Sequence, residues 1–244
     1  MSKEEDNMVI LVTGGYKHLG YWITRELKQA GFYVVATYRK DRKIAEATAS
    51  ELHIPVYEAD VTDKTDIQEL FARIESNDGM VGGVVNNASS FPTGPLQSMS
   101  REDFEGTFRT SVFATNMIIN RALPGMMEMG GGKIINIGMA GLSDVRGYRE
   151  VAAHAAAKTA LMVLTRSWAS EFKKDKIMVN MVSPGIIDYS WRDDTWRARM
   201  RRITPSGKLT PPSEVSAAVR FLIERGDVTG RVIEVDPNFH PSSV

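Results

Sequence analysis

The sequence predicts an α/β fold in which one doubly wound parallel sheet carries helices on both faces. Short apolar runs alternate with longer amphipathic segments along the whole chain, as strands joined by helical crossovers do. No internal repeat, low-complexity tract or linker interrupts this alternation. The 244 residues suffice for one sizeable α/β domain and are few for two. We therefore expect residues 1–244 to form a single, Rossmann-like domain.

Each expected element follows from its own hydrophobic pattern. The strands are expected at residues 8–13, 32–38, 54–59, 81–87, 133–138, 176–182 and 231–235, which are short apolar runs. The helices are expected at residues 21–30, 42–52, 63–75, in two segments within 101–129, and at 149–172, with one more before the last strand. Gly31 ends the first helix.

The composition narrows the classes of function. Lys plus Arg and Asp plus Glu number 30 each, so no net field favours nucleic acid or an anionic membrane. There is no cysteine, which excludes thiol nucleophiles and cysteine metal sites and fits a reducing cytoplasm. The first residues, MSKEEDNM, are polar, and no apolar run approaches 18 residues, so neither a signal peptide nor a membrane span is expected. We expect a cytoplasmic protein without a metal site.

The turn TGGYKHLG joins the first expected strand to the first helix. Its glycines, Gly14, Gly15 and Gly20, would let the backbone approach a pyrophosphate at the positive end of the helix. The cofactor candidates in this turn are Thr13, Gly14, Lys17, His18, Leu19 and Gly20. The alternative is an ordinary strand-to-helix turn, because the spacing departs from the GxGxxG pattern.

The end of the second strand bears on the choice of cofactor. An acidic residue there would bind an unphosphorylated ribose, whereas arginine accommodates a 2′-phosphate. The strand ends at Arg39, with Lys40, Arg42 and Lys43 close by, and Asp41 stands among these cations. Lys17 adds a further cation from the turn. The pattern favours NADP(H) over NAD(H).

Five motifs in order give the chain a resemblance to the short-chain dehydrogenase/reductase family over essentially its whole length. They are TGGYKHLG (13–20), Asp60-Val61, Asn86-Asn87-Ala88-Ser89, VNMVSPG (179–185) and TGRVIEVDPN (229–238). The basic residue His18 replaces the middle glycine of the family's turn, and together with NNASSFPTGPL this is similar to pteridine reductases. The resemblance implies that Asp60 and Val61 contact adenine, that Asn87 and Ala88 border the cofactor, and that Pro184, Gly185 and Ile187 border the nicotinamide.

The resemblance also places an altered catalytic site. The family's YxxxK motif becomes His154-x-x-x-Lys158, its serine becomes Met139 and its asparagine becomes Ser111. Lys158 would then hold the nicotinamide ribose. Replacements for the missing groups are expected in the loop before His154, where Ser143, Asp144 and Tyr148 lie.

Two interpretations of His154 remain open at this point. Residues four apart share a helix face, so His154 and Lys158 should point the same way. His154 could act as the proton donor near neutral pH, although Lys158 would lower its pKa and make it a poorer acid. Alternatively, His154 fills the space of the tyrosine while Lys158 holds the ribose.

A substrate lid is expected at about residues 188–210, where the family covers its substrate. Trp196, Met200 and Ile203 would form one apolar helix face. Residues 191–204 also carry five arginines against two aspartates, which would either attract an anionic substrate or form a solvated face. In the family, helices equivalent to 107–128 and 149–172 form the dimer core of a tetramer, so a homo-oligomer is expected.

Three functional hypotheses follow. The first is an NADP(H)-dependent short-chain oxidoreductase that reduces a carbonyl or pterin-like small molecule with His154 in place of the tyrosine. The second is a catalytically silent NADP(H)-binding scaffold or sensor, and the third is a non-redox enzyme such as a dehydratase or isomerase. A pterin, a quinone-like ring and a 3-oxoacyl thioester are all open as substrates.

Overall fold

One parallel sheet forms the centre of the molecule, which we describe from a computed structural model over residues 8–144 and 147–238. All strand pairs are parallel, in the order β3-β2-β1-β4-β5-β6-β7. The strands are β1 (Val9–Val12), β2 (Tyr33–Tyr38), β3 (Val56–Glu58), β4 (Val81–Asn86), β5 (Gly132–Ile137), β6 (Ile177–Pro184) and β7 (Val232–Val235). This order reverses between β1 and β4, where open α/β sheets bind their ligands.

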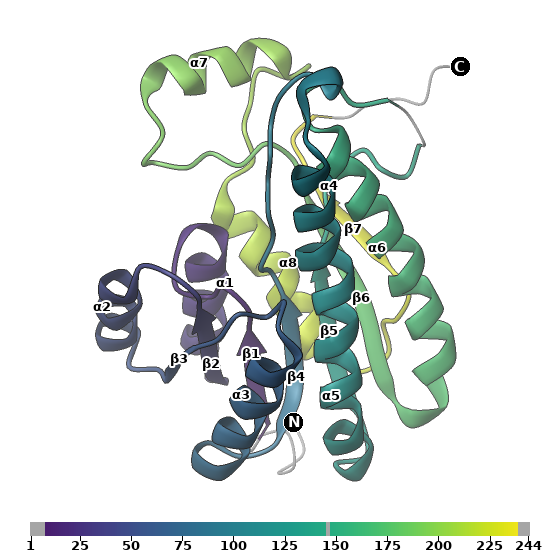
Figure 1. Ribbon diagram of the computed structural model, residues 1–244. Helices are drawn as coiled ribbons and strands as arrows, with labels where there is room; N and C mark the ends of the chain where they lie inside the picture. The colour runs from purple at the N-terminus through teal and green to yellow at the C-terminus, as the bar shows by residue number, and fades with distance from the viewer. Residues whose placement is uncertain (1–7, 145–146, 239–244) are drawn as a thin grey trace.

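Helices cover both faces of this sheet (Figure 1). They are α1 (His18–Gln29), α2 (Arg42–Leu52), α3 (Lys64–Asn77), α4 (Arg101–Phe108), α5 (Ala114–Glu128), α6 (Ala152–Glu171), α7 (Asp194–Ile203) and α8 (Pro212–Glu224). The core on one face joins the strands to α3, α5 and α6, and the core on the other joins them to α1 and α8. The predicted doubly wound fold is therefore confirmed.

The observed elements differ from the predicted ones mainly at their ends. Helix α1 begins at His18 rather than at residue 21, because the Tyr21 N–H already donates to the Lys17 carbonyl at 3.2 Å and closes the first helical turn. Strand β6 continues to Pro184, two residues beyond the predicted end. The two helical segments predicted within 101–129 are joined by a π-helical stretch, η3 (Arg109–Phe113). Such stretches are frequent at functional sites.

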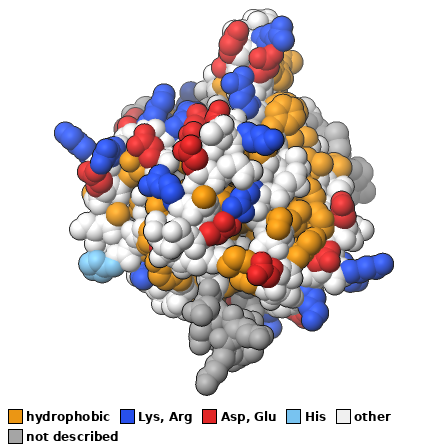
Figure 2. Space-filling view, turned by 60° about the horizontal axis from the view of Figure 1, so that its bottom comes forward, with side chains coloured by type: hydrophobic (Ala, Val, Ile, Leu, Met, Phe, Trp, Pro, Cys, Tyr) orange, Lys and Arg blue, Asp and Glu red, His pale blue; other side chains and the backbone are white. Residues whose placement is uncertain are grey.

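The surface mixes charges of both signs. Figure 2 shows basic and acidic side chains interspersed over the face it displays, without a large field of one sign. Within residues 8–144 and 147–238, none of the helices combines the length and apolar character that a membrane span needs. In the same ranges, no three His, Asp or Glu side chains gather to form a metal site.

Candidate active site

The turn after β1 is tied to the loop after β4 by hydrogen bonds. The Thr13 hydroxyl oxygen accepts from the backbone N–H groups of Asn87 and Ala88, both at 3.0 Å. The Asn87 side-chain amide donates back to the carbonyls of Thr13 at 2.9 Å and Gly14 at 3.3 Å. The side chains of Thr13 and Asn87 therefore fix the shape of the turn, and the turn offers its backbone to a ligand.

The glycines of this turn are required by close contacts. Gly14 has a φ of +62°, in the left-handed region that favours glycine. A Cβ on Gly20 would lie 2.1 Å from the Gly14 carbonyl oxygen and 2.7 Å from the Asn87 amide nitrogen. His18, by contrast, takes a φ of 53° with a side chain in place. Its ring leaves the turn and packs against residues that follow β6.

The start of α1 suits an anion. The N-cap residue, Lys17, makes no side-chain cap, and the first turn holds no acidic residue. The positive end of the helix dipole is thus uncompensated by its own sequence, as at dinucleotide phosphate sites. Together with the cradle between Gly14 and Gly20, where a Cβ would not fit, these residues fit a dinucleotide pyrophosphate.

The charges at the end of β2 are paired with one another. The Lys17 ammonium lies 2.5 Å from the Asp41 carboxylate, and the Arg39 guanidinium lies 3.3 Å from Asp60. The hydrogen bond from Lys17 lowers the pKa of Asp41. Burial alone would raise the pKa of Asp60, but hydrogen bonds from Thr62 and the Arg39 charge lower it overall. Both pairs are solvent-exposed, so each contributes little energy and can open to a ligand.

Lys158 lies fully inside the protein, with 2% of its surface exposed. Its ammonium donates to the Ile137 carbonyl at 2.7 Å, at the end of β5. An ammonium has three donors, and this is the single hydrogen bond that it makes with the described residues. Burial lowers the pKa of Lys158 to about 8. A buried cation with most of its donors unused is costly, which marks the group as part of a ligand site.

His154 lies one turn before Lys158 on the same face of α6, as the spacing predicted, and is 7% exposed. Its Nδ1 is 3.2 Å from the Ser90 carbonyl oxygen. The Phe91 ring contacts it edge-on, with 4.5 Å between ring centroids. Burial first, and the charge of Lys158 second, lower the pKa of His154 to about 3. At neutral pH the ring is therefore uncharged.

Ser111 and Met139 lie on two different elements, η3 and the segment after β5. Ser111 is buried in η3, and its hydroxyl lies 3.1 Å from that of Ser89. Met139 is half-buried and packs against the core beside α6. Its thioether offers no hydrogen-bond donor. Ser89 belongs to the loop after β4, so this loop brings a second hydroxyl next to that of Ser111.

Two of the loop candidates, Ser143 and Tyr148, form hydrogen bonds elsewhere in the protein, and the third, Asp144, lies at the surface. Ser143 donates to Glu234 on β7 at 3.1 Å. The Tyr148 hydroxyl donates to the Gly141 carbonyl within its own loop. Asp144 is exposed, and among the contacts of the described residues none joins it to His154 or Lys158. The structure thus brings His154 and Lys158 together with Ser90 and Phe91, which sequence reasoning did not single out.

Helix α7 lies within the segment predicted to be a substrate lid. Of its predicted apolar face, Trp196 and Met200 are half-buried, whereas Ile203 is 64% exposed. Helix α7 stands away from the sheet, at the top of Figure 1.

The arginines of the lid are largely engaged within the protein. Arg197 forms two hydrogen bonds to Asp188, at 2.7 and 3.0 Å, and Arg201 lies 3.6 Å from the same carboxylate. The hydrogen bond from Arg197 lowers the pKa of Asp188. Arg199 lies 3.5 Å from Glu150, just before α6. These pairs favour the interpretation of a self-neutralised helix over that of an anion trap.

An aromatic strap, which we define as residues 189–192, contacts the glycine turn of residues 13–20. The His18 ring lies 5.7 Å from the Tyr189 ring and 4.8 Å from the Trp191 ring. The Tyr189 hydroxyl interacts with the backbone N–H of Leu19, and burial raises its pKa to about 12. Arg192 stacks over Trp191. The run of aromatics after Pro184-Gly185 was a signal in the sequence that could have identified this strap.

The segment after β6, where the resemblance implies the nicotinamide, is held by two backbone hydrogen bonds. The Thr210 N–H donates to the Ile186 carbonyl at 2.8 Å, and the Asp188 N–H donates to the Thr210 carbonyl at 2.9 Å. This pairing holds Ile187 between them and leaves its N–H without a backbone partner among the described residues. A Cβ on Gly185 would lie 2.5 Å from the Asp236 side chain, so only glycine fits there.

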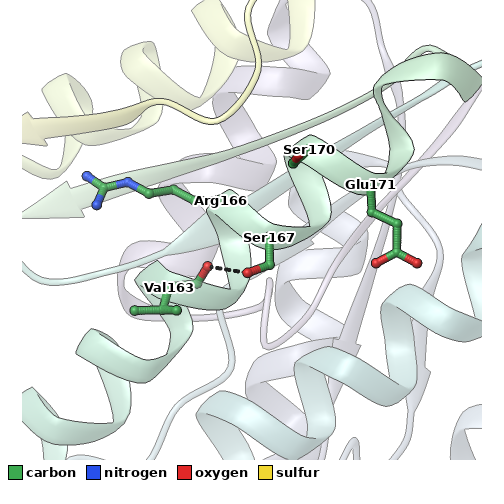
Figure 3. Close-up of a pocket in the computed structure, with 5 residues that line it drawn as sticks. All are labelled: Val163, Arg166, Ser167, Ser170 and Glu171. Carbon is green, nitrogen blue, oxygen red and sulfur yellow. Dashed lines mark hydrogen bonds between the residues drawn. The ribbon is translucent and has the colours of Figure 1, made fainter.

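The outer face of α6 is separate from this site. A shallow hollow there is lined by Val163, Arg166, Ser167, Ser170 and Glu171, all from the second half of the helix (Figure 3). Ser167 donates to the Val163 carbonyl at 3.1 Å. His154 and Lys158 are buried on the opposite side of α6, so this hollow is not the substrate site.

The sheet order, the glycine turn and the buried lysine define a Rossmann-like dinucleotide-binding protein. A family model described as enoyl-(acyl carrier protein) reductase matches residues 16–240. The chain belongs to the short-chain dehydrogenase/reductase family, whose members are nicotinamide-dependent oxidoreductases.

Individual relatives agree with this assignment. Carbonyl reductase family member 4 of Xenopus laevis is 30% identical over 93% of this chain and 96% of its own length. Acetoacetyl-CoA reductase of Rhizobium meliloti is 31% identical over the same shares. A short-chain dehydrogenase/reductase mutant of Serratia marcescens superposes with a TM-score of 0.86 at 25% identity, over 96% of this chain and 98% of that one.

Proposed function

We propose that the protein is an NADP(H)-dependent short-chain oxidoreductase that reduces a carbonyl or pterin-like small molecule, with His154 in place of the family's tyrosine. The observation that carries this proposal is Lys158, a buried ammonium that makes one hydrogen bond where three are available. Two vicinal ribose hydroxyls would supply the missing acceptors. When bound, NADPH supplies the hydride.

The chain's own residues divide the binding of the cofactor among them. Backbone groups of residues 14–20 would hold the pyrophosphate at the start of α1, and Lys17 and Arg39 the 2′-phosphate. Asp60 and Val61 would contact the adenine, and Asn87 and Ala88 would border the cofactor through their backbone. On the nicotinamide side, the N–H of Ile187 and the bend at Pro184-Gly185 would hold the carboxamide.

The experiment that tests this proposal is a fluorescence titration with NADPH, with NADH in parallel. We expect saturable binding of both with a preference for NADPH. Equal affinities would instead support Asp41 as a ribose ligand and remove the 2′-phosphate site. Absence of binding by either cofactor would contradict the proposal.

Replacing Arg39 with alanine should weaken NADPH binding about tenfold, because one charge-assisted hydrogen bond to the phosphate is lost. NADH affinity should stay nearly unchanged, since NADH has no 2′-phosphate. The control is Arg42→Ala, which removes a cation three residues away that pairs with Glu46 at 2.8 Å. An equal loss for both cofactors, or the same loss in the control, would contradict the role given to Arg39.

A second candidate is a catalytically silent NADP(H)-binding scaffold or sensor. Two features favour this candidate: His154 is uncharged, and Met139 has no hydrogen-bond donor. Neither side chain is an effective acid for protonating an alkoxide. The two candidates differ in one observable. Steady oxidation of NADPH in the presence of a pterin or ketone supports the oxidoreductase, and binding of NADPH without any turnover supports the scaffold.

We further propose a cytoplasmic homo-oligomer, a dimer or tetramer, that contacts its copies through η3, α5 and α6. Phe113 and Val163 are exposed on these elements, at 58% and 56%, and the α6 face of Figure 3 is open. The absence of cysteine fits a reducing compartment.

A further inference from the structure

The loop after β4 fixes the orientation of the His154 ring. A backbone carbonyl only accepts hydrogen bonds, so the Nδ1 that lies 3.2 Å from the Ser90 carbonyl carries the proton. Phe91, the next residue, contacts the same ring edge-on at 76° between the planes. Two consecutive residues, 64 positions away in the sequence, thus prevent the ring from turning over.

The opposite nitrogen of this ring is an acceptor. A neutral imidazole has one donor and one acceptor nitrogen, and burial together with Lys158 keeps this one neutral. Nε2 makes no hydrogen bond with the described residues, and it is not one of their buried unpartnered atoms, which lie on Asn86, Ser183 and Thr210. The accessible part of His154 therefore includes Nε2, beside a Phe91 side chain that is 58% exposed.

We infer that His154 presents a hydrogen-bond acceptor, Nε2, to the substrate, and that the substrate is a ring or alcohol carrying an N–H or O–H group at that place. The inference rests on the proposed function and reverses the usual polarity of the site. A tyrosine hydroxyl donates a hydrogen bond to a carbonyl oxygen. Nε2 and a carbonyl oxygen are both acceptors, so they would repel each other instead of forming a hydrogen bond.

The need for a hydrogen-bond donor on the substrate separates the substrate classes that the sequence left open. A pterin-like ring has N–H groups that can donate to Nε2. A secondary alcohol, which is the substrate in the oxidising direction of the same hydride transfer, has a hydroxyl that can donate. The keto group of a 3-oxoacyl thioester and an isolated ketone have no such donor. A further consequence is that the proton for any reduced atom does not come from the His154 ring, because the one proton of that ring is held by the Ser90 carbonyl.

The first test reads the tautomer directly by nitrogen-15 NMR of histidine-labelled protein, with His154→Gln to assign the signals. We expect the His154 proton on Nδ1 and a bare Nε2 throughout pH 5.5 to 8. A proton on Nε2, or protonation of both nitrogens in this range, would overturn the inference whether or not any cofactor binds.

The second test uses matched probes in complexes that cannot turn over. Quinazolin-4-one should bind about tenfold more tightly than its N3-methyl derivative, because methylation removes the donor. Likewise 1-(2-naphthyl)ethanol on the NADPH complex should bind more tightly than the matching ketone on the NADP⁺ complex. In His154→Tyr, whose hydroxyl both donates and accepts, these preferences should disappear.

The outcomes separate the inference from the proposed function. Equal or tighter binding of the ketone and the methylated ring by the natural protein would overturn the inference, and so would preferences that persist in His154→Tyr. A failure of NADPH to bind would overturn the proposed function, and the NMR measurement would still decide the tautomer. If the N–H ring is preferred but the alcohol is not, the substrate is a heterocycle.

Discussion

Replacing Lys158 with methionine should make the protein more stable and abolish its binding of NADPH. Burial lowers the lysine pKa from 10.5 to about 8, which corresponds to a cost of about 3 kcal/mol for the charged form at neutral pH. Methionine fills a similar volume without charge, but it leaves the Ile137 carbonyl without its donor, at a cost of about 1–2 kcal/mol. We expect a net gain of about 1–2 kcal/mol in the free energy of unfolding.

The pH dependence of this gain provides an internal check. Between about pH 8 and pH 10.5, the unfolded natural chain keeps the Lys158 proton while the folded chain releases it. The natural protein therefore gains stability through this window as pH rises, and its deficit relative to Lys158→Met should shrink. Urea unfolding at pH 7 and pH 10 measures the difference.

The matched control for this substitution is Lys64→Met at the exposed start of α3. It should change the free energy of unfolding by less than about 0.5 kcal/mol and leave NADPH binding intact. If Lys158→Met binds NADPH with the natural affinity, Lys158 does not hold the ribose. The proposed function then loses its main support, which is the buried ammonium with a single hydrogen bond.

Replacing Gly20 with alanine should unfold or severely loosen the cofactor turn. The new Cβ would lie 2.1 Å from the Gly14 carbonyl oxygen. The backbone at residues 13 and 14 cannot move away without breaking the hydrogen bonds that the Asn87 side chain donates to its carbonyls. We expect a loss of about 2–4 kcal/mol in the free energy of unfolding. NADPH binding should fall below detection, because the turn would no longer match the pyrophosphate.

Gly106→Ala is the control for this change. Gly106 lies inside α4, and a Cβ there would meet no atom within 4 Å. Alanine should therefore stabilise the helix by about 0.5–1 kcal/mol without effect on the cofactor. A Gly20→Ala protein as stable as the natural one would show that the turn adapts, and would contradict its role as a rigid cradle.

The fold was predictable because burial on both faces of a parallel sheet leaves a plain signal. Strands such as 81–86 are apolar at nearly every position, and the helices between them carry one polar face. The start of α1 was missed because the glycines at positions 14, 15 and 20 assigned all of residues 13–20 to a turn. The short strand β3 was overestimated because only its central residues pair with β2.

The candidate site was predictable where local spacing determines it. The distance of four residues on a helix placed His154 and Lys158 on one buried face. The partner of His154 was not predictable, because it is the backbone carbonyl of Ser90 and carries no signature of side-chain type. The five arginines of residues 191–204 outnumber the two aspartates there, and their further partners Asp188 and Glu150 lie outside that stretch.

The contact of the Trp191 ring with His18 places a chromophore directly on the glycine turn between β1 and α1. The chain has four tryptophans. Trp168, on α6, is buried in the core, and Trp22 lies on α1 under Arg25. Trp191 is half-open to solvent, at 52%, and it alone among the four contacts the histidine of the turn within the described residues. Its emission therefore serves as a native optical probe of the strap, so that arrival of a dinucleotide can be followed in real time without any attached dye.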